Sequence, residues 1–367
     1  MTSPTLTIIN VVGARPNFMK IAPLMAAYRR WPDIRPVLVH TGQHYDARMS
    51  HLFFEQLGIP RPDVNLEVGS GSHAVQTAEV IRRFEPVVEQ FRPDCVLVVG
   101  DVNSTVACTL VATKMGVRVA HVEAGLRSFD RSMPEEINRL LTDAVSDFLF
   151  VSEPSGVTNL QREGVPPERI FFVGNVMIDT LRANLAKAHA SRIGADLGLE
   201  PRGYAVLTLH RPSNVDDPRT LAALMGVVGK MAARLPVVFP VHPRTRRNLE
   251  ANGLAAGLAN VRLVEPLGYL DFLKLMADAR LLLTDSGGIQ EEATILRVPC
   301  LTLRENTERP VTVDVGCNTL VGTDPGRILA AFERIMAAGD LQCAVPEKWD
   351  GHAAERIVDV LHGALAP

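Results

Sequence analysis

The sequence lacks the features that mark several broad classes of protein. No apolar run approaches the roughly 18–20 residues that a membrane-spanning helix needs. The 38 Lys and Arg nearly balance the 41 Asp and Glu, so the formal net charge of −3 gives no support for binding nucleic acid or an acidic membrane. With 47% hydrophobic and 22% charged residues, the chain has a globular composition and is not mainly disordered.

Cysteine is scarce and scattered, and no CxxC pair occurs. The five cysteines are Cys95, Cys108, Cys300, Cys317 and Cys343. An odd, dispersed set predicts reduced, mostly buried thiols of a cytoplasmic protein, with neither a disulfide framework nor a zinc site. The opening residues 1–7 contain no basic region and run into a strand-like stretch, so we expect no secretory signal.

Familiar cofactor and metal motifs are also missing. No G-x-G-x-x-G follows a predicted strand, because the segment 69–72 lacks both the third glycine and that setting. G-x-x-x-x-G-K-[ST] and HExxH do not occur. We therefore predict no bound nicotinamide, no kinase-type phosphate loop, no metal and no other cofactor.

The chain does contain a regular alternation of apolar runs and helical patterns. Predicted strands cover 7–12, 36–40, 95–99, 118–122, 206–209, 237–240, 261–264, 281–284 and 300–303. Predicted helices include 17–30, 75–91, 104–115, 218–234, 269–279, 287–296 and 353–365. Strands that are apolar on both faces belong to parallel sheets covered on two sides, so we predict an α/β fold of two doubly wound, Rossmann-like domains with a cleft between them.

The length of 367 residues also suggests two domains, at about 150 residues each. We expect an N-terminal domain over 1–185, joined by the C-terminal helix in 351–367, and a C-terminal domain over 186–350. Ligands of such sheets bind beyond the carboxyl ends of the strands, so the residues after each strand are the candidates for a site.

Two cations follow the first predicted strand. Gly13 permits a tight turn and Pro16 suits a helix start, while Arg15 and Lys20 could reach an anion at that helix N-terminus. The alternative is an ordinary strand-to-helix turn with two solvated cations.

Three acidic residues follow later strands of the same domain. Asp101 either caps the next helix or places a carboxylate at the cleft. Glu123 ends a strand that should be buried, so it needs an ion-pair partner such as Arg127 or a chemical role. Glu135 opens a helix, where an acid complements the helix dipole and by itself proves nothing.

The second domain repeats this arrangement with basic residues. His210 with Arg211, and His242 with Arg244, each follow a predicted strand. A loop histidine is usually structural or exposed, but two His–Arg pairs at strand ends favour anion binding.

A glycine-rich turn is the sharpest local signal. Ser286, Gly287 and Gly288 lead from a strand into a helix, where bare backbone N–H groups and the helix dipole favour a phosphate. Glu292, on that helix, could accept both hydroxyls of a ribose, and Arg309 brings a further cation after the next strand. The alternative is a plain glycine-rich helix start.

Together these segments resemble the non-hydrolysing UDP-N-acetylglucosamine 2-epimerase family over essentially the whole chain. The matching segments are, in order, GARPNFMK, TGQHYD, GDVNST, HVEAGLRS, PEEINR, GNVMID, LHRPSN, PVHPRT, LTDSGGIQEE and TERP. The resemblance implies a glycosyltransferase-B-like fold, a homodimer, a UDP-sugar substrate and a cytoplasmic role in supplying UDP-N-acetylmannosamine for surface polysaccharide.

The resemblance also assigns roles to individual residues. The family's catalytic acids fall on Asp101, Glu123 and Glu135, and its catalytic histidine falls on His210. Its nucleotide-binding residues fall on Arg15, Lys20, Ser286, Gly287, Gly288, Glu292 and Arg309, and His242 is a further cleft residue. The chain departs from many bacterial members at 43–46 and 69–72, a region that in those members helps to hold a second, activating UDP-sugar.

The implied chemistry fits a site rich in carboxylates. The proton on C2 of the sugar is not beside a carbonyl, so a route without nicotinamide must first break the C1–O bond to UDP. Elimination gives a 2-acetamidoglucal, and re-addition with protonation of the opposite face gives the epimer. Such a route needs proton-transfer groups on both faces of C2 and strong stabilisation of the leaving diphosphate.

Other functions remain compatible with the motifs. A hydrolysing epimerase would release N-acetylmannosamine and UDP from the same intermediate. A glycosyltransferase would need an acceptor, and a non-enzymatic UDP-sugar sensor would need no set of carboxylates. A structural protein fits least, because the polar residues gather at strand ends.

Overall fold

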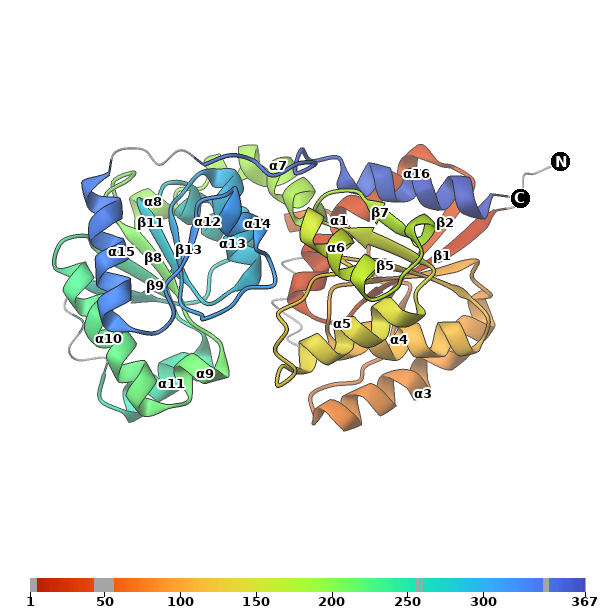
Figure 1. Ribbon diagram of the computed structural model, residues 1–367, viewed down its shortest axis with the longest axis horizontal. Coiled ribbons are helices and arrows are strands. Elements are labelled where there is room, and N and C mark those ends of the chain that lie inside the picture. Colours follow the sequence, from red (N-terminus) through yellow and green to blue (C-terminus); the bar gives the residue numbers. More distant parts are fainter. Residues whose placement is uncertain (1–4, 43–55, 255–257, 259, 339–342, 367) are drawn as a thin grey trace. The chain divides into compact units, whose positions relative to one another are not determined.

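A computed structural model describes residues 5–42, 56–254, 258, 260–338 and 343–366 of the chain (Figure 1). They divide into two compact units: unit 1 comprises Met1–Ala183 with Glu347–Pro367, and unit 2 comprises Asn184–Pro346. Each unit is built on one parallel sheet flanked by helices, so the predicted α/β class with two doubly wound sheets is confirmed.

Unit 1 contains a 7-stranded sheet in the order β3-β2-β1-β4-β5-β6-β7. The strands are β1 (Leu6–Val12), β2 (Ile34–His40), β3 (Val64–Asn65), β4 (Cys95–Val99), β5 (Arg118–Val122), β6 (Phe148–Val151) and β7 (Ile170–Phe172). Neighbouring strands are parallel throughout. The strand order reverses between β1 and β4, which is where ligands bind in sheets of this kind.

The helices of unit 1 cover both faces of that sheet, which is why β4 is buried along its whole length. In Figure 1, α1 (Arg15–Ala27) and α16 (Ala353–Leu365) lie on one face. The other face carries α3 (His73–Phe91), α4 (Asn103–Lys114) and α5 (Pro134–Val145). Two further helices are α6 (Pro154–Arg162) and α7 (Val176–His189), and α7 runs across the boundary into unit 2.

Unit 2 contains a 6-stranded sheet in the order β10-β9-β8-β11-β12-β13. The strands are β8 (Ala205–Thr208), β9 (Val237–Pro240), β10 (Val261–Val264), β11 (Leu281–Thr284), β12 (Cys300–Thr302) and β13 (Asn318–Leu320). α10 (Pro218–Ala232) and α15 (Pro325–Ala337) share an apolar core with these strands. The remaining helices are α8 (Ile193–Asp196), α9 (Pro212–Val215), α11 (Pro243–Ala251), α12 (Tyr269–Ala277), α13 (Gly287–Leu296) and α14 (Val311–Asp314).

Helix boundaries follow local capping chemistry. α1 begins two residues before the predicted start, because the Asn17 side chain accepts the backbone N–H groups of Gly13 (3.1 Å) and Ala14 (2.9 Å) and closes the turn ahead of the helix. α15 begins after Asp324, whose carboxylate accepts the Arg327 N–H at 2.7 Å.

The C-terminal helix packs against unit 1 although it comes last in the sequence. The Asp179 carboxylate accepts the backbone N–H groups of Ala353 (3.2 Å) and Ala354 (2.7 Å) at the start of α16. Near the end of α16, His362 contacts Asp33 at 2.8 Å. Unit 1 is therefore assembled from two separate stretches of chain.

The prediction that all the cysteines are reduced thiols is wrong for two of them. Cys317 and Cys343 form a disulfide with a Cα–Cα distance of 5.2 Å, whereas Cys95, Cys108 and Cys300 are free and buried. The chain that follows α15 returns beside β13, where Ala344 donates its N–H to Val315 O at 3.1 Å. This return brings together two cysteines 26 residues apart, and their sequence spacing does not reveal it.

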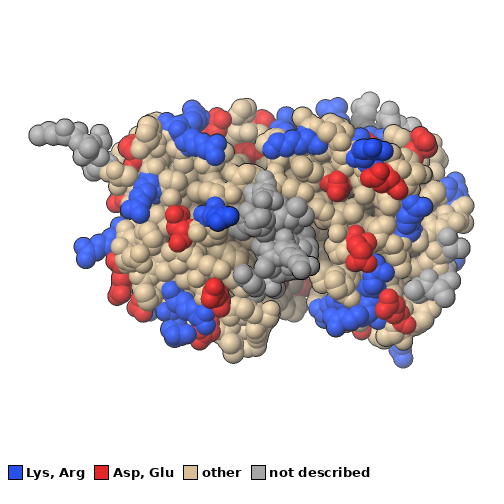
Figure 2. All heavy atoms as spheres, turned by 180° about the vertical axis from the view of Figure 1, so that it is seen from behind, with Lys and Arg blue, Asp and Glu red and all other residues tan. Residues whose placement is uncertain are grey.

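The surface shown in Figure 2 carries basic and acidic side chains interspersed with one another. No helix in the described part of the chain is both long enough and apolar enough to cross a bilayer.

Candidate active site

The first candidate side chains lie where β1 and β5 of unit 1 end. Lys20, on the second turn of α1, is buried, and its ammonium group forms an ion pair with the Glu123 carboxylate. Asn17 ties the same turn to the end of β4 by donating to Val99 O at 3.1 Å. Lys20 is therefore not the solvated cation of an ordinary turn. Arg15 begins α1, and its side chain lies outside the described part of the structure.

Glu123 has an unusual backbone for a residue with a side chain. Its φ is +73°, in the left-handed region, which costs of order 1–3 kcal/mol for such a residue and persists only where surrounding contacts hold it. Those contacts include bonds from the N–H groups of Glu123 and Ala124 to Phe150 O, both 3.1 Å. The predicted alternative was an ion pair with Arg127 or a neighbour: an ion pair does form, but with Lys20, and Arg127 pairs with Asp143 and Glu163.

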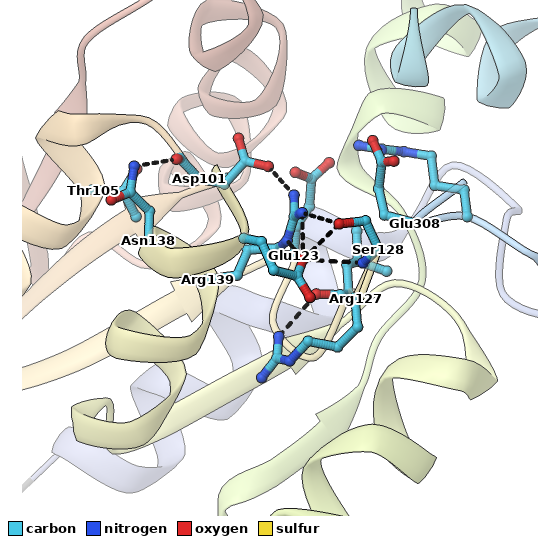
Figure 3. Close-up of polar contacts among 12 residues, drawn as sticks. Asp101, Thr105, Glu123, Arg127, Ser128, Asn138, Arg139 and Glu308 are labelled. Atoms are coloured by element: carbon cyan, nitrogen blue, oxygen red, sulfur yellow. Dashed lines mark hydrogen bonds and ion pairs between the residues drawn. The ribbon is translucent and has the colours of Figure 1, made fainter. Parts of the chain in front are cut away.

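Asp101 follows β4 and is held by α5. Its Oδ2 accepts from the Arg139 guanidinium at 2.5 Å, and its backbone carbonyl accepts from Asn138 Nδ2 at 2.8 Å (Figure 3). The residue at the N-cap of α4 is Val102, with no side-chain cap, so the helix-cap interpretation of Asp101 is wrong. The Asp101 side chain is 28% exposed, which leaves the carboxylate accessible.

Glu135 and Glu136 are neighbours in sequence with opposite surroundings. Glu136 is buried and accepts the backbone N–H groups of Ser128 and Phe129, each at 3.0 Å. Burial alone would raise the pKa of Glu136, but these bonds and the Arg139 guanidinium lower it. Glu135 has no hydrogen-bond or ion-pair partner among the described residues. Glu136 therefore holds the Ser128 loop, and Glu135 is available for chemistry.

A cavity of about 310 Å³ lies within unit 1, and neither Glu123 nor Glu136 is among the residues that line it. Asp101 and Glu135 both line it. The polar side chains around them are His73, Gln76, Asn103 and Asn138. A cavity with two carboxylates and several amides can bind a polyhydroxylated ligand and exchange protons with it.

In unit 2, His210 and Asp285 follow the adjacent strands β8 and β11. His210 Nδ1 lies 2.7 Å from Asp285 Oδ1, while the histidine side chain is 52% exposed. Asp285 is buried, which by itself would raise its pKa, but His210 and backbone N–H donors lower it. A buried carboxylate that orients an accessible imidazole is an arrangement suited to proton transfer or to an anion.

The glycine-rich turn is shaped by side chains packed against it. Ser286 is the N-cap of α13, and its N–H donates to Thr284 Oγ1 at 2.9 Å. A Cβ atom on Gly287 would lie 2.6 Å from an Arg309 nitrogen and 2.8 Å from a Glu308 oxygen, so a larger residue there would displace these two side chains. Gly288 follows in the first turn of the helix.

Arg309 forms ion pairs with acidic side chains of unit 2. Its Nε donates to Glu291 at 2.6 Å and its NH1 to Glu308 at 2.5 Å, and Glu308 also accepts from Arg304 at 2.8 Å. Burial opposes ionisation of Glu308, but the two arginines outweigh it and lower its pKa. The guanidinium therefore helps to build the turn at the start of α13.

Glu292 and His242 lie elsewhere in unit 2. Glu292 is buried and accepts the Tyr269 hydroxyl at 3.2 Å; burial, with a smaller contribution from Glu291, raises its pKa to about 8. His242 is exposed at the N-cap of α11, where its Nδ1 accepts the Arg244 N–H at 3.3 Å. The nucleotide-binding roles of both residues remain predictions.

Sequence reasoning missed the residues that hold the candidate groups. Arg139 lies in the same PEEINR segment as Glu135, and Asp285 lies in the same turn as Ser286. Arg139 lies three positions after Glu136, on the same face of the helix, and this spacing was the sequence signal for their ion pair. Among the described residues, no three His, Cys, Asp or Glu side chains are grouped so that they could hold a metal ion.

Comparison with known proteins completes this description. Residues 26–362 match the family model described as UDP-N-acetylglucosamine 2-epimerase. A UDP-N-acetylglucosamine 2-epimerase of Methanococcus maripaludis is 40% identical over 370 residues, covering 97% of this chain and 98% of that protein. A UDP-2,3-diacetamido-2,3-dideoxy-D-glucuronate 2-epimerase of Pseudomonas aeruginosa is 43% identical over 321 residues, covering 86% of this chain and 88% of that protein.

A solved structure agrees with the sequence comparison. The Methanocaldococcus jannaschii UDP-GlcNAc 2-epimerase in complex with UDP-GlcNAc and UDP superposes with a TM-score of 0.91 at 41% identity, covering 98% of this chain and all of that chain.

Proposed function

Because the chain belongs to the UDP-N-acetylglucosamine 2-epimerase family, we propose that it interconverts UDP-N-acetylglucosamine and UDP-N-acetylmannosamine without releasing free sugar. The observation that carries this proposal is the set of carboxylates at the strand ends of unit 1. Glu123 is held by Lys20, Asp101 is held by Arg139, and Glu135 lines the cavity without a described partner. A protein that only binds a UDP-sugar would need no such set.

The proposed reaction is an elimination followed by an addition. A base takes the C2 proton as the C1–O bond breaks, giving a 2-acetamidoglucal and UDP. The UDP oxygen then attacks C1 as an acid delivers a proton to the opposite face of C2. Nothing is oxidised or reduced overall, so the reaction needs proton-transfer groups and an anion site.

The side chains of unit 1 suit the proton transfers. Lys20 and Arg139 restrict where the Glu123 and Asp101 carboxylates can lie, and fixed carboxylates transfer protons more effectively than mobile ones. Glu135 shares the cavity with Asp101 and is the less restrained of the two. These three residues are our candidates for the acid and base on the two faces of C2.

The side chains of unit 2 suit the nucleotide. The N-terminus of α13, with Ser286 and the two glycines, offers N–H groups to the diphosphate. His210, oriented by Asp285, is our candidate for the group that stabilises or protonates the leaving phosphate oxygen. Glu292 would accept the ribose hydroxyls. Arg309 supports the turn, so we assign it a supporting role in UDP binding.

Proton NMR of UDP-N-acetylglucosamine with the purified protein in D₂O tests the proposal. UDP-N-acetylmannosamine signals with deuterium at C2 are the expected result. Free N-acetylmannosamine with UDP would instead indicate a hydrolysing epimerase, and unchanged substrate with UDP still bound would indicate a transferase or a sensor. A parallel sample with the diacetamido uronate sugar nucleotide tests the substrate named for the Pseudomonas aeruginosa relative.

The proposal includes a homodimer and a cytoplasmic location, both of which the family resemblance implies. Light scattering coupled to size-exclusion chromatography tests the first, with a mass near twice 40.0 kDa as the expected result. Cell fractionation with an antibody against the chain tests the second.

A further inference from the structure

A buried histidine lies between the two turns that carry Asp101 and Glu123. His121, on β5, has 0% exposure. Its Nδ1 lies 2.6 Å from Asp143 Oδ1, and its Nε2 lies 2.8 Å from the carbonyl oxygen of Gly100. Both ring nitrogens are thus within hydrogen-bond distance of oxygen.

The identity of these oxygens decides where the ring hydrogens lie. A backbone carbonyl can only accept, so Nε2 carries a hydrogen. The Asp143 carboxylate also accepts the Gly125 N–H at 3.0 Å and an Arg127 nitrogen at 2.7 Å. Burial would raise the pKa of Asp143, but His121 and Arg127 outweigh burial and lower it. Asp143 therefore holds the Nδ1 side of the ring, while the Gly100 carbonyl accepts from Nε2.

Arg127 extends this cluster to the surface. It bridges Asp143 and Glu163, with its NH2 2.6 Å from Glu163 Oε2, and the Glu163 side chain is 36% exposed. The buried ion pair in contact with His121 is therefore Asp143–Arg127.

The His121–Asp143 pair contacts two turns, one leading into Asp101 and one following Glu123. Gly100 directly precedes Asp101, and Gly125 lies two residues after Glu123. Gly100 has a φ of +68°, and a Cβ there would lie 2.8 Å from Lys20 Nζ and 3.5 Å from a Glu123 oxygen. The Gly100 turn, which leads into Asp101, therefore lies against the Lys20–Glu123 pair.

We propose that His121, held by Asp143, is a positioning residue whose Nε2–H bond to the Gly100 carbonyl fixes Asp101 relative to Glu123. The proposal rests on the proposed epimerase function, since its kinetic consequence is a loss of turnover. The hydrogens on the ring can be observed without any activity, so failure of one proposal is distinguishable from failure of the other.

Two substitutions test the two hydrogen bonds of the His121 ring one at a time. The amide nitrogen of Asn matches the position of Nδ1, so His121→Asn keeps a donor for Asp143 and loses the bond to Gly100. The amide nitrogen of Gln matches Nε2, so His121→Gln keeps the bond to Gly100. We expect His121→Asn to lower kcat about 10²-fold, because small misplacements of catalytic groups cost about that much, and His121→Gln to stay within about tenfold of wild type. The Kd for UDP should be unchanged in both variants.

His362→Asn is the matched control, because it breaks another His–Asp pair, that with Asp33, before β2. It should lower thermal stability and leave kcat at the wild-type value. Equal losses of kcat in the two His121 variants, at equal folded fraction, would overturn the proposal.

Nitrogen-15 NMR of histidine-labelled wild-type protein gives a second measurement that does not depend on any variant folding. A protonated Nε2 on His121 at the assay pH is expected. A bare Nε2 would overturn the bond to Gly100, and with it the proposed positioning role.

Discussion

The guanidinium of Arg139 donates to the Asp101 carboxylate at 2.5 Å and to the Glu136 carboxylate at 2.6 Å. One side chain thus links a candidate catalytic acid to the buried acid that holds the Ser128 loop. Arg139→Met should destabilise the fold by about 3–5 kcal/mol, because it leaves a buried carboxylate without its partner, and should lower kcat about 10²-fold.

Arg139→Lys separates these two effects. Lysine keeps the charge and loses the planar fork, so we expect most of the stability to return while kcat stays at least about tenfold low. Urea unfolding and steady-state kinetics on the same preparations check both values. Wild-type kcat in the Lys variant would mean that Arg139 supports the fold without orienting Asp101.

The contribution of the three carboxylates to kcat should be separable from nucleotide binding. Asp101→Asn, Glu123→Gln and Glu135→Gln should each lower kcat by about 10²-fold or more, because each replaces a proton-transfer group by an amide that cannot exchange a proton. The Kd for UDP, measured by calorimetry, should stay at the wild-type value. Glu168→Gln, in the short helix before β7, is the control and should leave both quantities unchanged. Near-normal turnover in all three variants would contradict the proposed mechanism.

Arg309→Ala should weaken UDP binding and destabilise unit 2 together. The guanidinium packs against Gly287 and pairs with Glu291 and Glu308, so its loss removes one ion-pair partner from each of two buried carboxylates, at a cost of about 3–5 kcal/mol. Calorimetry with UDP and chemical unfolding check the two effects. An unchanged Kd for UDP in folded variant protein would remove Arg309 from any role in binding.

UDP binding should depend on pH through Glu292. Burial raises the pKa of this carboxyl to about 8, so the free protein at neutral pH holds it mainly protonated. If the carboxylate accepts the ribose hydroxyls, binding must release that proton, and affinity should rise up to tenfold per pH unit until about pH 8. Calorimetry in buffers of different ionisation enthalpy, between pH 7 and 9, measures the released proton. Glu292→Gln should abolish both effects; proton release that persists in this variant would assign it to another group.

The same shift has a consequence for stability, with a definite sign. The folded-state pKa of Glu292 lies above the ordinary value of 4.5 for a glutamate, so the folded protein binds the proton more tightly than the unfolded chain does. The resulting stabilisation is complete below the unfolded-state value and is lost as pH rises through about 8.

Reduction of the Cys317–Cys343 disulfide should lower the stability of unit 2. The bond closes a loop of 26 residues, for which chain entropy gives about 3–4 kcal/mol. Thiol titration of denatured, unreduced protein should count three free thiols, and Cys317→Ser with Cys343→Ser should reproduce the reduced stability. Five titratable thiols without reductant would show that the bond does not form in solution.

The sequence predicted the elements and strand ends of this fold well, because parallel strands buried on both faces leave long apolar runs such as that of β4. It missed β7, whose three residues are only partly buried and therefore give no comparable run. It also missed β6, although that strand is fully buried.

The partners of the candidate groups were harder to predict than the groups themselves. Glu123 was recognised because a charge at the end of a buried strand needs an explanation, yet the expected partner, Arg127, was four residues away. The actual partner, Lys20, is 103 residues away and meets it only because β1 and β5 both flank β4. Strand order, which a single sequence does not display, decides such pairings, and the same holds for Asp101 with Arg139.

Unit 2 interrupts unit 1, and this order matters while the protein is being synthesised. The ribosome finishes every strand of both sheets before it makes α16, which buries one side of α1. During that interval the apolar surface of α1 has no cover. Unit 1 can therefore reach its final packing only after the last residues emerge, and a nascent chain stalled before residue 353 would expose the surface to which chaperones bind.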